Sequence, residues 1–582
     1  MPSYSAPIAD YRFILSELLD FDAQMAEIGM DIDVETAIAI LEEAGRIASD
    51  RLYPLNRHGD EEGSRLIAGK VTTPAGFAEA YRDFAAGGWT SLSADPAHGG
   101  QGLPFMMQLW LDEMLSAANL SFGLFPGLSR GAYEAIAAHA SEELKAIWLP
   151  PLVSGEWTGA MALTESGAGT DLALLKTSAR PQCDGSYLVS GTKIFISSGD
   201  HDFGGNIVHL VLARLPDAPA GVKGISLFLV PKFLPDQTGA FTRRNAMSVG
   251  ALEKKMGIHA QPTCVMNYDG ATGWLVGEPN KGLAAMFTMM NAERLMVGIQ
   301  GLGIAGIAYQ QAAEYARERL QGRSADGTRG PVAIIEHADV RRMLLSIRAF
   351  VEAGRALAAW TALQLDRSHH HPNSDERERA GHFVALLTPV VKAAFTDFGF
   401  EAAVQAQQVF GGHGYIREWG MEQFVRDARI AQIYEGTNGV QAMDLVGRKL
   451  ALEGGRVVAD FLAIVEADVL VAGEVPEASE VAARTLEALV LLRRETHRLD
   501  GANAAHANAV ATDYLRMFAL VAFGWMWSRM AAAAARGGAE AHHPKITVAA
   551  FFASRMLPQV HGLAASVAQE DGAMMHLRTD EF

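Results

Sequence analysis

The sequence is poor in cysteine and in positive charge. Only Cys183 and Cys264 occur among 582 residues, too few and too far apart for a disulfide framework or a metal site, so the chain suits a reducing compartment. Lys and Arg number 49 against 67 Asp and Glu, which gives a formal net charge of −18. Because nucleic-acid binding relies on a basic surface that releases counterions, this balance argues against a nucleic-acid partner.

The sequence also lacks the marks of export and of membrane insertion. Residues 1–5 have neither the basic start nor the apolar stretch of a signal peptide. The most apolar later segment, 514–535, contains Arg516 and Arg529, which predicts a buried amphipathic helix instead of a membrane span. We therefore expect a cytoplasmic protein with no membrane span.

Changes in hydrophobic periodicity divide the chain, which is too long for a single core. Apolar residues three and four apart predict helices at 34–52 and 132–149, whereas 187–196, 207–213 and 225–230 are short β-type runs between turn residues. The predicted fold is mainly α with a central β domain. The predicted domains are 1–156 (helical), 157–279 (β), 280–452 (helical) and 453–582 (an alanine-rich helical tail for packing or assembly).

Two small-residue loops follow predicted strands. Met161 to Asp171 is rich in hydroxyls and glycines, and Gly191 to Gly199 again runs from a strand into a hydroxyl-bearing turn. Loops of this kind can hold a polar heterocycle or a phosphate, although an ordinary loop is the commoner explanation for either one alone. Two such strand ends in one β domain suggest a single shared ligand.

Glu435 is a candidate general base. It follows the apolar pair Ile433-Tyr434 and precedes a Gly-Thr-Asn turn at 436–438. A glutamate held against the apolar pair with little water is harder to ionise, so its pKa would rise toward the working pH of a general base. Gly436 would let the chain approach a ligand closely. By itself, a glutamate in such a turn is more often a solvated turn residue.

Three further motifs have structural explanations. Gly301-Leu-Gly303-Ile-Ala-Gly306 matches the dinucleotide fingerprint, but it lies inside a predicted helix with no preceding strand, so we expect close helix packing.

His369 to His371 adjoins a charged loop, where adjacent histidines lack the fixed geometry of a metal site, and we expect a solvated loop and no metal. Gln408 to Tyr415 places glycines at a predicted helix end, where they either stop the helix or admit a ligand's phosphates or ribose.

Taken in order and spacing, five motifs resemble the acyl-CoA dehydrogenase flavoproteins: Met161 to Asp171, Phe195 to Ser197, Asn291 to Arg294, Gln408 to Gly412, and Tyr434 to Thr437. The match extends to about Leu450. The segment 8–14 and the helical tail further resemble an enlarged bacterial branch of the family that acts on 3-methylthiopropionyl-CoA. The resemblance implies a helical N-terminal domain, a β-barrel middle domain, a helical bundle and an additional C-terminal helical domain.

The resemblance implies FAD as the cofactor. Thr164 would contact the flavin, Phe195 would cover it with a smaller ring than the Trp of many relatives, and Ser197 would lie near flavin N5. Relatives carry an Arg before Thr-Phe-Gly that reaches the FAD pyrophosphate across the dimer interface, whereas here Arg319 precedes Leu-Gln-Gly. The implied cofactor-binding residues are Met161, Leu163, Thr164, Phe195, Ile196, Ser197, Arg319, Gln408, Gly411, Gly412, Thr437, Asn438 and Gly439. The implied substrate-binding residues are Thr170, Asn291, Arg294 and Gly436.

The resemblance also implies the reaction. Glu435 would take the α-proton of an acyl-CoA while the β-hydride passes to flavin N5, with the enolate stabilised by the Glu435 backbone N–H and the ribityl 2′-hydroxyl. The product is a trans-2-enoyl-CoA, and an electron-transfer flavoprotein accepts the electrons. The substrate would be 3-methylthiopropionyl-CoA or another short or medium acyl-CoA. Since the motif at 408–412 serves a neighbouring subunit's FAD in relatives, a homodimer or higher homo-oligomer is implied.

Four alternatives stay open from the sequence. Some relatives place the base where this chain has Glu293, but they lack a glutamate at the Glu435 position, so we prefer Glu435. An acyl-CoA oxidase would keep the same base and reduce oxygen. A DNA-binding alkylation-response flavoprotein would need a basic tail, which 453–582 does not supply. A catalytically silent scaffold would not turn over acyl-CoA.

Overall fold

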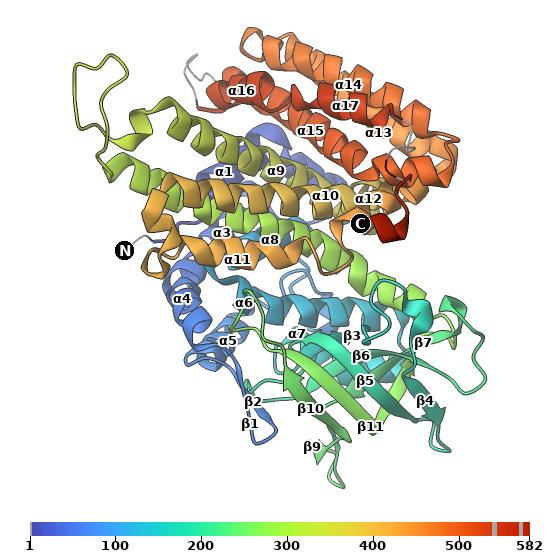
Figure 1. The fold of residues 1–582 in the computed structure, drawn as a ribbon. Coiled ribbons are helices and arrows are strands. Elements are labelled where there is room, and N and C mark those ends of the chain that lie inside the picture. Colours follow the sequence, from blue (N-terminus) through green and yellow to red (C-terminus); the bar gives the residue numbers. More distant parts are fainter. Residues whose placement is uncertain (1–2, 538–543, 570–573, 575) are drawn as a thin grey trace. The chain divides into compact units, whose positions relative to one another are not determined.

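The computed structural model describes residues 3–537, 544–569, 574 and 576–582, which form two compact units. We call Met1–Gly45, Pro104–Ala117 and Val297–Phe582 the helical unit, and Arg46–Leu103 with Ala118–Met296 the sheet unit. Two long helices, α6 (Phe105–His139) and α8 (Gly282–Glu318), contribute residues to both units (Figure 1).

The strands of the sheet unit confirm the predicted central β domain. They are β1 (Arg65–Ile67), β2 (Lys70–Thr72), β3 (Thr158–Ala162), β4 (Ser178–Pro181), β5 (Tyr187–Ser197), β6 (Ile207–Arg214), β7 (Ile225–Pro231), β8 (Phe233–Pro235), β9 (Phe241–Arg244), β10 (Met247–Leu252) and β11 (Thr263–Val276). The helices of this unit, besides parts of α6 and α8, are α4 (Tyr53–Glu62), α5 (Phe77–Ala86) and α7 (Glu142–Val153).

Strand pairing closes the main sheet into a barrel. β11 pairs with both β5 and β7, β7 pairs with β6, β6 meets β4 through Ser178 and Arg214, and β4 pairs with β5, which completes a ring. β10 extends the sheet from β11, and β3 runs parallel to β6. The closed ring agrees with the β-barrel that the family resemblance implies.

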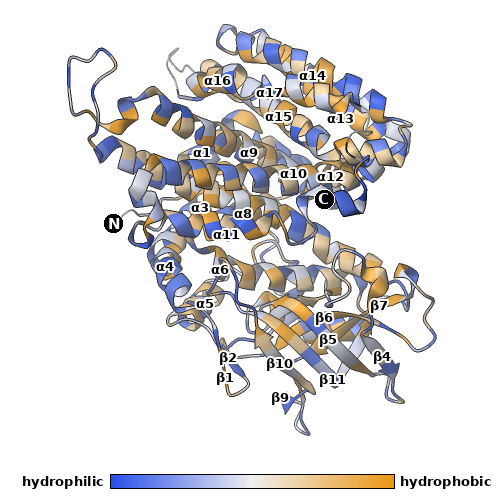
Figure 2. Cartoon of the chain, in the orientation of Figure 1, coloured by the Kyte–Doolittle hydropathy of each residue, from blue (hydrophilic) through white to orange (hydrophobic). Residues whose placement is uncertain are grey.

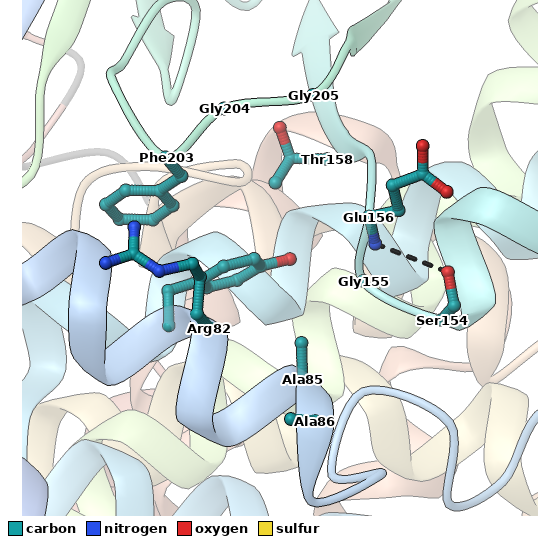
Figure 3. Close-up of a pocket in the computed structure, with 11 residues that line it drawn as sticks. Arg82, Ala85, Ala86, Ser154, Gly155, Glu156, Thr158, Phe203, Gly204 and Gly205 are labelled. Carbon is teal, nitrogen blue, oxygen red and sulfur yellow. Dashed lines mark hydrogen bonds between the residues drawn. The ribbon is translucent and has the colours of Figure 1, made fainter.

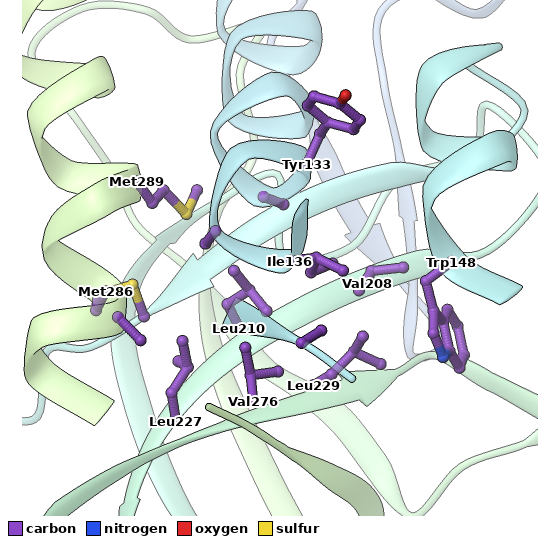
Figure 4. Packing of buried hydrophobic residues seen from close by; sticks show 14 of the residues in the cluster. Tyr133, Ile136, Trp148, Val208, Leu210, Leu227, Leu229, Val276, Met286 and Met289 are labelled. Carbon is purple, nitrogen blue, oxygen red and sulfur yellow. The ribbon is translucent and has the colours of Figure 1, made fainter. Parts of the chain in front are cut away.

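The strands β6 and β7 are almost entirely apolar because both of their faces are buried, and the polar residues His209 and Ser226 are buried with them. On β6, Val208 and Leu210 belong to a cluster that includes Ile136 of α6 and Trp148 of α7 (Figure 4), whereas Val211 belongs to a second cluster within the barrel. Successive side chains therefore enter different cores, and no polar residue is needed at alternate positions.

The helical unit contains the remaining helices. They are α1 (Ile8–Phe13), α2 (Phe21–Glu27), α3 (Val34–Ile47), α9 (Ala338–His370), α10 (Ser374–Val409), α11 (Met421–Ala431), α12 (Asn438–Asp444), α13 (Arg456–Gly473), α14 (Ser479–Leu499), α15 (Ala504–Arg536), α16 (Pro544–Arg555) and α17 (Gln559–Val567). In Figure 2, α14 alternates hydrophilic and hydrophobic residues, as an outer helix with one packed face should.

Two helices of this unit, α10 and α15, are long and apolar enough to cross a membrane, but 78% and 94% of their apolar windows are buried. Such burial is typical of core helices. The prediction for 514–535 is right about burial and wrong about an amphipathic face, because Met517 to Ser528 are buried on all sides of α15.

Two of the three glycines in the dinucleotide-like motif, Gly301 and Gly303, serve helix packing as predicted, whereas a Cβ at Gly306 would meet nothing closer than 3.9 Å. Gly301 lies within α8, where a Cβ atom would come 2.4 Å from the carbonyl oxygen of Phe395 on α10. On the facing helix, a Cβ at Gly399 would come 2.5 Å from the Gly301 carbonyl oxygen. Side chains at these positions would push the two helices apart.

One predicted helix is in fact two. The periodicity at 132–149 predicts a single helix, but α6 ends at His139 and α7 begins at Glu142. Ser141 caps α7 with its side chain, which accepts the backbone N–H of Leu144 at 3.4 Å. This cap is the physical reason for the break, since a serine hydroxyl satisfies an N–H that has no partner within the helix.

Candidate active site

Glu435 lies in the turn between α11 and α12 in a left-handed conformation, with φ 55°. The next residue, Gly436, has φ 84°, and a Cβ there would come 2.7 Å from Nε2 of Gln441. That amide donates to the Glu435 carbonyl oxygen at 3.1 Å. A non-glycine residue held in this region is strained, and such strain is concentrated at functional sites.

The turn is held from within by Lys392 of α10, which is fully buried. Its ammonium donates to the Gly436 carbonyl oxygen and to Oδ1 of Asn438, both at 2.8 Å. Asn438 in turn donates from Nδ2 to Oδ1 of Asp397 at 2.7 Å. The side chain of Asn438 is therefore occupied with α10 and ties the turn to that helix.

Sequence reasoning missed Lys392. Between Phe383 and Thr396 it is the one charged residue, which is a usable signal because a buried ammonium in an apolar helix needs specific partners. The partners turn out to be the residues on either side of Thr437, next to the candidate base.

The apolar flank predicted for Glu435 is only partly present. Tyr434 is half-buried, and its hydroxyl donates to Oε1 of Gln300 on α8. The prediction is wrong for Ile433, which is 45% exposed, and Glu435 itself is half-buried. Ile433 lies two residues after the end of α11, in a turn that leaves its side chain at the surface.

Phe195 occupies a β-bulge in the sheet unit. The register between β5 and β11 shifts there, so that Ile194 and Phe195 lie opposite the single residue Val265. Phe195 has φ 61° and is 60% exposed, which is unusual for a large aromatic ring. A β-bulge can redirect a side chain, and this one leaves the Phe195 ring at the surface.

The neighbouring loop is fixed to β5 by a buried ion pair. Ile194 N–H donates to the Thr164 carbonyl oxygen at 2.9 Å, and Nζ of Lys193 contacts the Leu163 carbonyl oxygen at 2.8 Å and Oε1 of Glu165 at 2.9 Å. Burial lowers the pKa of Lys193 to about 8, although Glu165 opposes the shift. The pair sets the position of Thr164.

The predicted residues of these two segments differ in exposure. Leu163 and Ile196 are buried, so their side chains belong to the core. Met161, Thr164 and Ser197 are half-buried, and Thr170 is exposed. Two hydroxyls and an exposed aromatic ring in adjacent segments suit a planar heterocycle with polar edges.

The rival base Glu293 lies in α8 and is only 3% exposed. A Cβ at Gly131 of α6 would come 2.5 Å from its Oε1, so the carboxylate packs directly against the α6 backbone. Arg294 is also buried, and its Nη1 donates to Oδ1 of the exposed Asn291 at 3.4 Å. Of the two glutamates, Glu435 is the more accessible.

The glycine motif after α10 is a helix stop with an open surface. α10 ends at Val409, and Gly411 has φ 58°. Within the described chain, no atom lies within 4 Å of a Cβ placed on Gly411 or Gly412. Such a surface can admit a phosphate or ribose closely, so the residues fit the nucleotide end of FAD. The remaining predicted residues Gln408, Thr437, Gly439 and Arg319 are exposed.

The histidine run is only partly the solvated loop that the sequence predicts, because His369 and His370 are exposed but helical. His369 and His370 end α9, and His371 is buried, with Nε2 3.1 Å from Oε1 of Glu27. A hydrogen-bond partner distant in the sequence accompanies the burial of this residue. Among the described residues, no group of His, Cys, Asp and Glu side chains could hold a metal ion.

The sheet unit also contains a cavity of about 320 Å³ between α5 and the segments at 154–158 and 203–205 (Figure 3). Arg82 and Phe203 lie together on one side of it, and Glu156 donates its backbone N–H to Oγ of Ser154 on another. None of the predicted site residues lines this cavity, so it is separate from the flavin and base assignments.

Comparisons with protein families agree with the order of helical and β domains described above. Sequence models match in order: "Acyl-CoA dehydrogenase, N-terminal domain" at 34–156, the middle domain at 160–271, the C-terminal domain at 280–450, and "Acetyl-CoA dehydrogenase C-terminal like" at 457–578. The chain belongs to the acyl-CoA dehydrogenase family. It is an FAD-dependent oxidoreductase that acts on an acyl-CoA.

Among its relatives is 3-methylmercaptopropionyl-CoA dehydrogenase of Ruegeria pomeroyi, 43% identical over 95% of this chain and 96% of the relative. A butyryl-CoA dehydrogenase of Syntrophomonas wolfei is 33% identical over 100% and 99%. The crystal structure of Caenorhabditis elegans ACDH-11 in complex with C11-CoA shares the fold, with a TM-score of 0.81, 19% identity, and coverage of 99% and 96%.

Proposed function

We propose that this acyl-CoA dehydrogenase oxidises 3-methylthiopropionyl-CoA to the corresponding trans-2-enoyl-CoA. The observation that carries the substrate is the 43% identity to the Ruegeria pomeroyi enzyme over nearly the full length of both chains, including the tail. Because that identity leaves more than half of the positions different, another short or medium acyl-CoA is the competing substrate class.

Glu435 is the proposed base that takes the α-proton. Its accessible position supports this role, as does the strained turn held by Lys392 and Gln441, which keeps the carboxylate in one orientation. The same turn presents the Glu435 backbone N–H, the proposed donor to the thioester carbonyl as negative charge develops there. Gly436 leaves room for the substrate beside it. FAD, when bound, supplies the acceptor for the β-hydride.

The flavin ring is assigned to Thr164, Phe195 and Ser197, with Met161, Leu163 and Ile196 shaping the same segment. The nucleotide end is assigned to Gln408, Gly411 and Gly412, with Arg319 and the turn at 437–439. Thr170, Asn291 and Arg294 are the proposed contacts to CoA. The proposed domains are 1–156, 157–279, 280–452 and 453–582.

The glycine motif supports a homodimer or higher homo-oligomer. Its surface is open, and the resemblance assigns it to the FAD of a neighbouring subunit. An electron-transfer flavoprotein is the proposed acceptor of the electrons, and the cytoplasm is the proposed compartment. The two cysteines support the last point, because Cys264 is buried and Cys183 exposed, with no disulfide between them.

The test is anaerobic bleaching of the flavin absorption by a panel of acyl-CoAs, followed by reoxidation. The panel contains 3-methylthiopropionyl-CoA, butyryl-CoA, octanoyl-CoA and isobutyryl-CoA. We expect the fastest bleaching with the first, and faster reoxidation by an electron-transfer flavoprotein than by oxygen. Faster bleaching by butyryl-CoA would overturn the substrate, and faster reoxidation by oxygen would indicate an oxidase.

A further inference from the structure

A second cavity, of about 330 Å³, lies within the helical unit and outside the residues assigned to catalysis. Its walls come from α9, α10, α15 and the end of α16 with the start of α17, so the helical bundle and the tail build it together (Figure 1). This volume is near the lower end of the range for small-molecule sites, about 300 to 1,000 Å³.

The charge of the cavity is opposite to that of the protein. Arg342, Arg516 and Arg555 line it against one acidic residue, Glu401, although the chain carries a net charge of −18. Three arginines against one carboxylate leave the lining with a net positive charge, which attracts anions. The lining therefore favours a negatively charged ligand.

Two of the arginines have carboxylate partners. Arg516 forms a bidentate pair with Glu401, at 2.7 and 3.0 Å, and its guanidinium lies 4.3 Å from the ring centroid of Phe398. Arg342 contacts the exposed Asp339 at 2.8 Å. The first pair is rigid, so it forms part of the wall, while the second is open to solvent and can rearrange.

Arg555 differs from both. It is the last residue of α16, it is exposed, and no ion pair to it is found among the described residues. The adjacent Met556 is buried and lines the same cavity, which fixes the backbone from which Arg555 extends. Arg555 is therefore the cation available to a ligand.

Gln405 indicates a second property of the ligand, a hydrogen-bond donor. It lines the cavity from α10, and its Oε1 is buried without a hydrogen-bond partner in the described part of the chain. A buried acceptor without a partner is unfavourable, and a hydrogen-bond donor on a ligand would relieve that cost. Apolar contact is available from Ile347 and Phe350 beside it.

The geometry points to a binding site for a small organic oxyanion that also carries a hydroxyl group. The oxyanion, a carboxylate or a phosphate monoester, pairs with Arg555 and Arg342, and the hydroxyl donates to Oε1 of Gln405. The hydrocarbon part lies against Ile347 and Phe350. This assignment concerns the junction of bundle and tail, so it does not depend on which acyl-CoA the enzyme oxidises.

Calorimetric titration of the FAD-loaded protein tests the site, with glycerol 3-phosphate and 3-hydroxybutyrate as probes. Inorganic phosphate and acetate serve as head groups without the hydroxyl, and sodium chloride keeps the ionic strength constant. We expect one of the two hydroxylated probes to bind at least tenfold more tightly than its head group alone, and the stronger probe identifies phosphate or carboxylate as the preferred oxyanion.

The variant Arg555→Gln should weaken that binding at least tenfold, and Gln405→Leu should remove the advantage of the hydroxyl. Arg536→Gln is the matched control, since Arg536 is an exposed arginine at the end of α15 that does not line the cavity. Failure of both hydroxylated probes to bind, equal binding to wild type and Arg555→Gln, or an equal loss in Arg536→Gln would overturn the proposal. Head groups that bind as tightly as the hydroxylated probes would overturn the proposed ligand class.

Discussion

Lys545 of α16 and Asp10 of α1 form a buried ion pair although 535 residues separate them. Lys545 also donates to Oε2 of Glu352 on α9 at 2.8 Å, and Arg355 links Asp10 to Glu113 of α6. Burial raises the pKa of the Asp10 carboxyl, but Lys545 and Arg355 outweigh it, and its pKa lies below the usual value. The tail is thus joined to the rest of the helical unit by ion pairs as well as by apolar packing.

Replacing Lys545 by Met should therefore destabilise the protein by about 3 kcal/mol, the low end for breaking a buried ion pair. Urea denaturation followed by tryptophan fluorescence measures the change. Arg578→Met is the control, because that ion pair with Asp580 is largely exposed and contributes little. Equal urea midpoints for Lys545→Met and the wild type would show that the pair does not fasten the tail.

Acid should destabilise the sheet unit before most carboxylates titrate. Burial lowers the pKa of His201 to about 3 and that of His209 to about 4, so both stay neutral in the fold. Unfolded histidines take up protons below about pH 6.5. Stability should fall as the pH drops from 6.5 towards 4, by up to about 1.4 kcal/mol per pH unit for each histidine.

The measurement is the urea midpoint at pH 7, 5.5 and 4.5 for the wild type and for His209→Gln. Glutamine can keep the contact to the hydroxyl of Tyr268, now 2.8 Å from Nδ1 of His209, but it does not titrate. The variant should lose less stability between pH 7 and 4.5 than the wild type. The same slope in both proteins would exclude His209 as a source of acid sensitivity.

Lys392→Met should slow flavin reduction by at least about tenfold while FAD stays bound. The two hydrogen bonds that hold Gly436 and Asn438 disappear, and a small displacement of a positioned base is costly. Stopped-flow bleaching by acyl-CoA gives the rate. Lys281→Met, at an exposed lysine, is the control. An unchanged rate in Lys392→Met, with its FAD content retained, would mean that Lys392 does not position the base.

Gly412→Leu should release FAD or dissociate the oligomer without unfolding the chain. A Cβ atom there meets nothing within 4 Å in the described chain, so the main effect expected of a side chain is on a ligand or a second subunit. Gly562→Leu is the matched control, since that exposed glycine of α17 also has open space around it. Light scattering measures the mass of the oligomer, and the flavin absorbance measures the FAD content. A variant with wild-type mass and full FAD would remove Gly412 from both assignments.

The sequence predicted several strands from the periodicity of their residues. The runs at 187–196, 207–213 and 225–230 are β5, β6 and β7. Both faces of β6 and β7 are buried, whereas β5 mixes buried and exposed positions. The glycines around Gly301 were assigned to packing because their helical context was visible. In these cases the local sequence pattern was sufficient to predict the structure.

Features that depend on distant partners were not predictable. His371 was expected in solvent but pairs with Glu27, and Lys392 was overlooked although it holds the turn of the base. The bulge at Phe195 arises from the register between β5 and β11, which a single strand does not reveal. Contacts between residues distant in the sequence determine the environment of these positions, and the candidate site contains two of them, Lys392 and Phe195.

The central claim is that Glu435, and not Glu293, takes the α-proton. Glu435→Gln keeps the size of the side chain and removes its basicity, so we expect FAD and acyl-CoA to bind while flavin reduction falls at least about a hundredfold. Glu293→Gln should keep a rate within about tenfold of the wild type, since Glu293 is packed against Gly131.

The decisive measurement is the anaerobic rate of flavin bleaching by saturating acyl-CoA in the wild type and in these two variants, each loaded with FAD. The account predicts a severe loss in Glu435→Gln alone. Bleaching at the wild-type rate in Glu435→Gln, together with an inactive Glu293→Gln, would contradict it.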